Sequence, residues 1–295
     1  MSADYRVICL SEAISPITHM AGSSGNVSMI AREPVVTPRG VAWVPYLSGN
    51  AIRHRCIREP GFRWLIAQWG LERQLTLSQL NFLFHGGNLT EGGGREDTSR
   101  IAEFQRIFPL GRLLGGSLPD QILAGSLQCW RGTLCCEENR SALEGTIGTH
   151  LPAMRLRPAE SFVSEYQYTR GDAAKNQADL IDGSEAGERN SNLMIFNGQT
   201  VISGAIFAHG FSLPHVDTRE LGALLLSLSL WQSAGGTIGG HGSRGHGRLR
   251  LYLLDEESVL AGAIQAYEDH VRDTRDEAVA WLHNVFSPRA VRGAS

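Results

Sequence analysis

Runs of hydrophobic residues separated by turn-forming residues predict a chain in which strands and helices alternate. Residues 5–10 and 40–47 are short runs rich in β-branched and aromatic side chains, which is typical of strands. Directly after the second run, Ser48-Gly49-Asn50 supplies helix-capping residues. Residues 51–59 are therefore predicted to be helical, with Pro60-Gly61 ending the helix.

The next part of the chain predicts further helices and one strand. Residues 62–84 show helical patterns that end at His85-Gly86-Gly87. A polar, glycine-rich connection then leads to another helical stretch at 98–108. Residues 127–136 alternate well enough between apolar and polar side chains to form a strand.

A long polar stretch, residues 168–192, interrupts the second half of the chain. A connection of this size in a compact domain is usually functional or disordered. Its flanks, 161–168 and 193–196, are predicted strands. The remaining pattern predicts, in order, a strand at 199–213, a helix at 217–233, a glycine-rich loop at 234–247, a strand at 248–254 and an amphipathic helix at 256–285.

The sum of these elements predicts an α+β fold. The chain shows no internal repeat and no clean domain boundary, so residues 1–295 are expected to form one domain with large insertions. The richest apolar run, 221–231, is about half as long as a membrane span requires. Residues 1–6 lack the features of a secretion signal, so we expect a cytoplasmic protein without membrane contact.

Cysteine spacing and charge narrow the chemistry further. The five cysteines are irregularly spaced and form no C-x-x-C pair, so we expect reduced, buried thiols, no metal site and no cofactor. Net charge is −3, yet Lys175 is the sole lysine beside 26 arginines. Arginine suits bidentate phosphate contacts and base stacking. Codon bias in a GC-rich genome would produce the same excess of arginine. Whether the arginines bind nucleic acid must therefore be judged from their positions along the chain.

Residues 240–245 match the pattern G-x-G-x-x-G, which in dinucleotide folds follows a strand and opens a helix. Here a predicted helix precedes the loop and a strand follows it, which argues against a dinucleotide site. Glycines let a backbone approach another polymer closely. No acidic residue lies within 239–250, where Arg244, His241 and His246 add positive charge. The loop therefore suits a phosphate backbone; the alternative is a flexible surface loop.

A second basic element follows the predicted cap. Arg53, Arg55 and Arg58 lie on one short helix whose first N–H groups and dipole favour an anion. Arg55 and Arg58 are three residues apart and are expected to share a face. A solvated basic face is the alternative interpretation, but the capped N-terminus favours phosphate binding.

These pieces together resemble the RAMP superfamily, and within it the Cas-seven-type backbone subunits of class 1 CRISPR effector complexes. The resemblance rests on Ser15-Pro16-Ile17-Thr18-His19, on Val44-Pro45-Tyr46-Leu47-Ser48-Gly49-Asn50-Ala51-Ile52-Arg53 and on the glycine-rich stretch 235–248. The sequence around Ser48 looks closest to that of the type IV branch. The resemblance implies an RRM/ferredoxin-like palm, with a mainly helical insertion (fingers) at 62–126 and a thumb-like hairpin at 160–196.

The resemblance also implies a crRNA-binding filament subunit. Its expected partners are a CRISPR guide RNA, a complementary target nucleic acid, copies of itself in a helical filament and other effector subunits. In the thumb, Tyr166, Tyr168 and Arg170 could stack on a displaced base, although core packing is equally open for the tyrosines. The full set of expected RNA contacts is Ser23, Ser24, Asn26, Ser48, Asn50, Arg53, Arg55, Arg58, Tyr166, Tyr168, Arg170, Gly240, Gly242, Ser243, Arg244 and His246.

Catalysis is not expected. Cleaving backbone subunits of the family use an aspartate after the first strand, whereas residues 17–31 contain no Asp or Glu and the nearest carboxylate is Glu33. The alternative is a metal-independent guide-RNA-processing endoribonuclease of the same superfamily. For that chemistry His19 or His54 could serve as the base near a 2′-hydroxyl. Each is more simply an RNA-facing or structural histidine.

Overall fold

The centre of the fold is a pair of long antiparallel strands, β1 (Ala3–Ala13) and β12 (Ile206–Val216). The middle of each strand is buried on both faces. Helices cover one face, and α6 (Arg140–Ile147) and its neighbouring loops cover part of the other. A computed structural model of the chain describes residues 3–24, 27–89, 97–148, 150–151, 156–170, 194–254 and 257–286.

Among the described residues, seven strands form the main sheet in the order β13-β1-β12-β9-β5-β4, with β8 also paired to β12. Its pairs are antiparallel. The remaining strands of this sheet are β4 (Arg32–Thr37), β5 (Gly40–Leu47), β8 (Gln128–Cys129), β9 (Gly132–Leu134) and β13 (Leu249–Leu253). The expected α+β class is confirmed.

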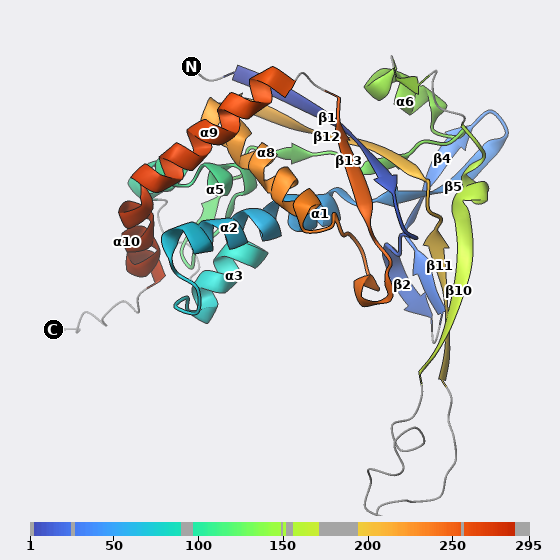
Figure 1. Cartoon of the computed structure of the whole chain (residues 1–295), viewed down its shortest axis with the longest axis horizontal. Helices are drawn as coiled ribbons and strands as arrows, with labels where there is room; N and C mark the ends of the chain where they lie inside the picture. Colours follow the sequence, from blue (N-terminus) through green and yellow to red (C-terminus); the bar gives the residue numbers. More distant parts are fainter. Residues whose placement is uncertain are drawn as a thin grey trace, which may run out of the picture.

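A second sheet lies beside the first and has the order β10-β11-β3-β2. Its long pair, β10 and β11, extends away from the body of the molecule, as Figure 1 shows. Strands β6 and β7 form a separate two-stranded hairpin. The strands are β2 (Met20–Ser24), β3 (Val27–Ile30), β10 (Val163–Arg170), β11 (Met194–Val201), β6 (Gly116–Ser117) and β7 (Ile122–Leu123).

Most of the helices gather on the opposite side of the main sheet from the β10–β11 pair, whereas α6 lies apart from them (Figure 1). No helix among the described residues is both long and apolar enough to cross a bilayer. The helices are α1 (Gly49–Ile52), the π-helix η1 (Arg53–Arg58), α2 (Glu59–Trp69), α3 (Leu77–His85), α4 (Thr98–Ile107), α5 (Pro109–Leu114), α6 (Arg140–Ile147), η3 (Ala159–Phe162), α8 (Thr218–Ser233), η5 (Gly242–Arg244), α9 (Glu257–Asp273) and α10 (Arg275–Phe286).

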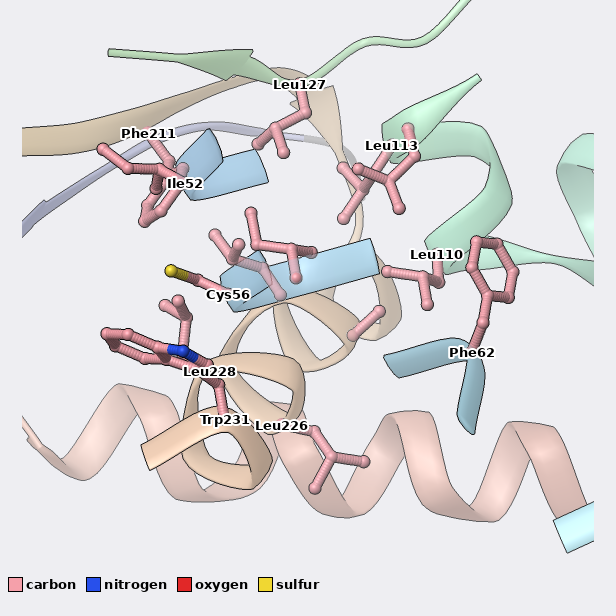
Figure 2. Packing of buried hydrophobic residues seen from close by; sticks show 14 of the residues in the cluster. Ile52, Cys56, Phe62, Leu110, Leu113, Leu127, Phe211, Leu226, Leu228 and Trp231 are labelled. Carbon is pink, nitrogen blue, oxygen red and sulfur yellow. The ribbon is translucent and has the colours of Figure 1, made fainter. Parts of the chain in front are cut away.

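The main core lies between the sheet and helix α8. Figure 2 shows Ile52 and Cys56 of the α1–η1 run in one cluster with Phe211 of β12 and with Leu228 and Trp231 of α8. Helix α8 is buried along most of its length, which explains its strongly apolar sequence. The segment that carries the predicted basic helix is therefore fixed firmly to the core.

The prediction that Pro60-Gly61 ends the first helix is wrong. Helices α1, η1 and α2 run on without a break, and the Glu59 N–H donates to the carbonyl of His54, five residues back. The wider π-turn gives the Pro60 ring room beside the preceding carbonyls. Gly61 serves packing instead, since a Cβ there would lie 2.5 Å from Ser227 Oγ.

Four other predicted elements are each divided in two. The stretch 62–84 breaks after Gly70, which is left-handed with φ 70°, and 199–213 breaks at a turn through Gly204 with φ 83°. The stretch 127–136 breaks where Trp130 lies over β12. The closing helix breaks at Thr274, whose hydroxyl donates to the carbonyl of His270 and bends the chain.

Candidate nucleic-acid interface

The predicted helix cap forms as expected. Ser48 has extended backbone angles, φ −68° and ψ 141°, and its Oγ accepts a hydrogen bond of 3.2 Å from the Ala51 N–H. Gly49 allows close packing there, because a Cβ would lie 2.9 Å from the carbonyl oxygen of Cys129. Asn50 is exposed beside the cap. Strand β5 thus delivers the helix start to the surface.

Arg58 does not fit its predicted role as an RNA contact. It is buried, and its guanidinium donates to the carbonyls of Leu83 (2.9 Å), Leu114 (3.4 Å) and Gly115 (3.1 Å) at the ends of α3 and α5. Burial, and then the charge of Arg53, lowers the pKa of Arg58 to about 10. Arg58 therefore joins two helix ends inside the molecule.

Arg53 and Arg55 are each partly engaged within the protein. Arg53 is half-buried and donates to the Leu114 carbonyl, while burial lowers its pKa. Arg55 donates to Glu59 over 2.6 Å and keeps 42% of its side chain exposed. Arg55 and Arg58, which were expected to share a face, differ in exposure: Arg55 is half-exposed and Arg58 is buried, both within the π-helix η1.

A shallow pocket of about 500 Å³ collects several of the predicted residues. Ser48, Asn50 and Arg53 line it together with Tyr46 and Arg131, neither of which was predicted. Arg131 is 60% exposed and pairs with Glu33. It occupies the break between β8 and β9, so no periodic signal in the sequence pointed to it. The only sequence feature that could have marked Arg131 as a nucleic-acid contact is the adjacent aromatic residue, Trp130.

The glycine-rich loop packs against the segment that follows β1. The Gly240 N–H donates to the Thr18 carbonyl over 2.8 Å, and the Gly247 N–H donates to the Pro16 carbonyl over 2.8 Å. The Gly240 amide is thus used inside the protein and is not free for a ligand. Gly242 and Ser243, in contrast, are exposed at the tip, where η5 forms one short turn.

The loop and the base of the predicted thumb meet in one cluster. The Arg244 guanidinium lies 3.7 Å from the centre of the Tyr168 ring, and His241 Nε2 lies 3.0 Å from the Tyr166 hydroxyl. Tyr168 also stacks on Phe196 across the strand pair, with ring centres 5.0 Å apart. Tyr166 and Tyr168 are therefore packed against neighbouring side chains and remain half-exposed.

Two adjacent residues join the glycine loop to the helix cap. Thr18 Oγ1 lies 2.8 Å from His246 Nδ1, and the Thr18 carbonyl accepts from Gly240. The next residue, His19, accepts a hydrogen bond of 3.1 Å from the Ser48 N–H through its Nε2. The two predicted basic elements, about 190 residues apart in sequence, are thus connected through these two adjacent residues.

The other predicted residues lie in the second sheet or beyond the described chain. Ser23 is exposed on β2, and it lines a separate groove of about 860 Å³ with Met29 and Trp43. Ser24 ends β2, and Arg170 ends the described part of β10. Asn26 lies outside the described residues.

The two candidate general bases occupy different settings. His19 Nε2 is engaged with the Ser48 N–H, and burial lowers the pKa of His19. His54 stacks on His85 with ring centres 6.1 Å apart, and burial lowers its pKa as well. Within the described ranges, no group of three or more His, Cys, Asp and Glu side chains could hold a metal ion.

Comparison with known proteins shows a likeness in fold to solved structures. No protein-family model matches the sequence, and no curated protein sequence matches it. A chain from a solved structure described as "Type IV-B CRISPR Complex" superposes with a TM-score of 0.55 at 15% identity. The match covers 86% of this chain and 92% of that chain. The chain therefore shares its fold with a component of that complex.

Proposed function

We propose that this chain is a crRNA-binding backbone subunit of a type IV CRISPR effector complex in the cytoplasm. The observation that carries the proposal is the meeting of the capped helix and the glycine loop at Thr18 and His19. A ribbon of phosphates could run from the exposed Asn50 to the exposed Arg244. The likeness in fold to a chain of a "Type IV-B CRISPR Complex" supports the same assignment.

In this proposal the main sheet forms an RRM/ferredoxin-like palm. Residues 62–126 supply the fingers insertion, and 160–196 supply the thumb. Copies of the chain would stack along the guide RNA in a filament, together with other effector subunits, and display the guide to a complementary target. Sequence would then be read by base pairing, while the protein grips the backbone.

The revised set of RNA contacts places most of the grip on exposed cations. Arg55, Arg131 and Arg244 are exposed or half-exposed, whereas Arg58 is replaced by Arg131 in the set. Among the described residues no carboxylate pairs with Arg244, so its charge is available to a phosphate. Serine and asparagine at the cap, Ser48 and Asn50, would add neutral hydrogen bonds.

We test RNA binding by purifying the protein with its native operon partners and sequencing the nucleic acid that accompanies it. Replacing Arg55, Arg131 and Arg244 by alanine should release that RNA. The slope of log affinity against log salt should fall by about two, since each phosphate contact to a single strand contributes about 0.7. Arg272→Ala on α9 is the matched control, and equal RNA retention by the triple variant and this control would refute the proposal.

We further propose that the chain does not cleave RNA. His19 is held by the backbone N–H of Ser48, and the segment 17–31 contains no carboxylate. Pure protein incubated with a hairpin guide precursor, with and without divalent metal, should leave the substrate intact. Cleavage without metal that disappears in His54→Ala or His19→Ala would instead establish the processing endoribonuclease.

A further inference from the structure

His241 lies at the centre of the cluster that joins the glycine loop to β10. Its Nδ1 is 2.8 Å from Arg244 Nη1, and its Nε2 is 3.0 Å from the Tyr166 hydroxyl. Its ring meets Tyr166 and Tyr168 edge to face, with centres 5.5 and 5.8 Å apart. Arg244 in turn lies over the Tyr168 ring. The imidazole thus contacts both the cation and the aromatic surface under it.

The hydrogen-bond chemistry assigns one protonation state to this histidine. A guanidinium can only donate, so His241 Nδ1 must carry a lone pair and accept from Arg244. The proton then resides on Nε2, which donates to the Tyr166 hydroxyl oxygen. Burial, and then the positive charges of Arg244 and His246, lower the pKa of His241 and favour this neutral ring.

The backbone at this position is unfavourable for histidine. His241 has φ 59° and ψ 26°, in the left-handed region that glycine and asparagine adopt more readily. This conformation starts the η5 turn, in which the Arg244 N–H donates to the His241 carbonyl over 2.9 Å. The turn brings the ring of residue 241 and the guanidinium of residue 244 to the same place. Such local strain often accompanies a functional constraint.

We propose that His241 is a positioning residue that holds the Arg244 guanidinium against Tyr168 before RNA binds. The inference rests on the proposed function, and it names a residue outside the expected contact set. Arg244 is exposed at the loop tip and would otherwise sample many rotamers. An arginine already fixed in one orientation loses less conformational entropy when it meets a phosphate.

Two substitutions separate the effect of the His241 ring from the effect of its backbone conformation. His241→Gly relieves the left-handed strain and removes the acceptor. His241→Asn also suits the left-handed backbone but keeps an acceptor, because Asn Oδ1 is bonded to Cγ just as His Nδ1 is. We expect His241→Gly to weaken binding of a labelled guide-length single-stranded RNA by about five- to tenfold, the effect of freeing one arginine side chain. His241→Asn should stay within about twofold of the unsubstituted protein.

A double substitution tests whether His241 acts through Arg244. If it does, His241→Gly combined with Arg244→Ala should bind RNA as Arg244→Ala alone does, within about twofold. Additive losses, or normal binding by His241→Gly, would overturn the inference while leaving the proposed function intact. Thermal melting of each variant without RNA checks that the fold is retained.

Side-chain NMR of the RNA-free protein distinguishes failure of the inference from failure of the proposed function. In ¹⁵N-arginine-labelled protein, the Arg244 guanidinium signal, identified with Arg244→Ala, should show restricted rotation that disappears in His241→Gly and persists in His241→Asn. Absence of RNA binding by the unsubstituted protein would overturn the proposed function, whatever the Arg244 signal shows. A freely rotating Arg244 in the unsubstituted protein would overturn the positioning role.

Discussion

Arg55 and Arg58 lie three positions apart in η1 and meet different surroundings. Arg58 is 7% exposed, and its guanidinium donates hydrogen bonds to three carbonyls at the ends of α3 and α5. Arg55 lies at the surface and pairs with Glu59, which also pairs with Arg63. Burial alone would raise the pKa of Glu59, but these two arginines hold it below its ordinary value. Identical side chains thus serve the interior and the surface.

We predict that Arg58→Met destabilises the protein by about 3 kcal/mol, because buried carbonyls lose their hydrogen bonds. Arg55→Met is the matched control and should cost less than about 1 kcal/mol, as exposed ion pairs contribute little. Urea unfolding of RNA-free protein measures both. Equal losses of unfolding free energy in the two variants would show that Arg58 is not the structural member of the pair.

His209 provides a pH-dependent contribution to stability. It is buried in β12, with Nε2 2.8 Å from Ser11 Oγ, and burial lowers its pKa to about 4. The unfolded chain takes up this proton near its ordinary pKa of about 6.5, so it binds more protons than the folded chain below that pH. The stability linked to His209 is therefore present at neutral pH and is lost as pH falls from about 6.5 toward about 4.

Comparison with His209→Gln isolates this contribution, because the other histidines are the same in both proteins. Between pH 7 and pH 4 the unsubstituted protein should lose about 2–3 kcal/mol more unfolding free energy than the variant. Denaturant titrations at a series of pH values provide the measurement. Parallel pH profiles for the two proteins would contradict the assignment.

At the scale of elements, the helical run from Gly49 to Trp69 shows how packing overrides a local stop signal. Pro60 follows a π-helical stretch, and Gly61 faces α8 at very short range. The glycine is there for close approach of two helices rather than for a turn. As a result, the helix that begins at the candidate interface is anchored in the core by its second half.

We predict that Gly61→Ala destabilises the protein by about 2 kcal/mol through overpacking. The added Cβ would lie 2.5 Å from Ser227 Oγ and 2.6 Å from Leu110 Cδ2. Gly145→Ala in α6 is the control, because a Cβ there meets nothing within 4 Å. It should stabilise by about 0.5–1 kcal/mol, the helix propensity of alanine over glycine. Shifts of the same sign in thermal melts would argue against this packing.

At the scale of the whole molecule, the β10–β11 pair projects from the body beside the glycine loop (Figure 1). The last described partners, Arg170 and Met194, face each other across the antiparallel pair. Near its base, Tyr166 and Tyr168 hold the loop through His241 and Arg244. The base of the β10–β11 pair is therefore attached to the glycine loop, and through the loop to the body of the molecule.

We predict that residues 171–193 can be replaced by Asn-Gly with the melting temperature unchanged to within about 2 °C. A two-residue turn of this type joins antiparallel neighbours without moving either strand. Circular dichroism during heating is the measurement. Replacement of residues 38–39, which join β4 and β5, by the same two residues serves as a control of hairpin redesign. A large fall in melting temperature for the 171–193 replacement alone would show that this segment supports the fold.

Local sequence by itself determined the elements whose signals are contained in their own residues. The strand at 40–47, the Ser48 cap, the helix at 98–108 and the Asp217-led helix all form where the pattern predicts them. Capping and periodicity depend on neighbours within one or two turns, so they can be read without the fold.

Only the tertiary structure decided which cations face solvent and which elements meet. Arg58 points inward because the carbonyls of α3 and α5 lie there, and Arg244 rests on Tyr168 because β10 runs beside the loop. The bridge through Thr18 and His19 joins partners far apart in sequence. Burial and hydrogen-bond partners depend on residues that are distant in sequence, which no local pattern contains. The sequence could therefore identify candidate RNA-binding residues but not which of them are exposed or which lie together.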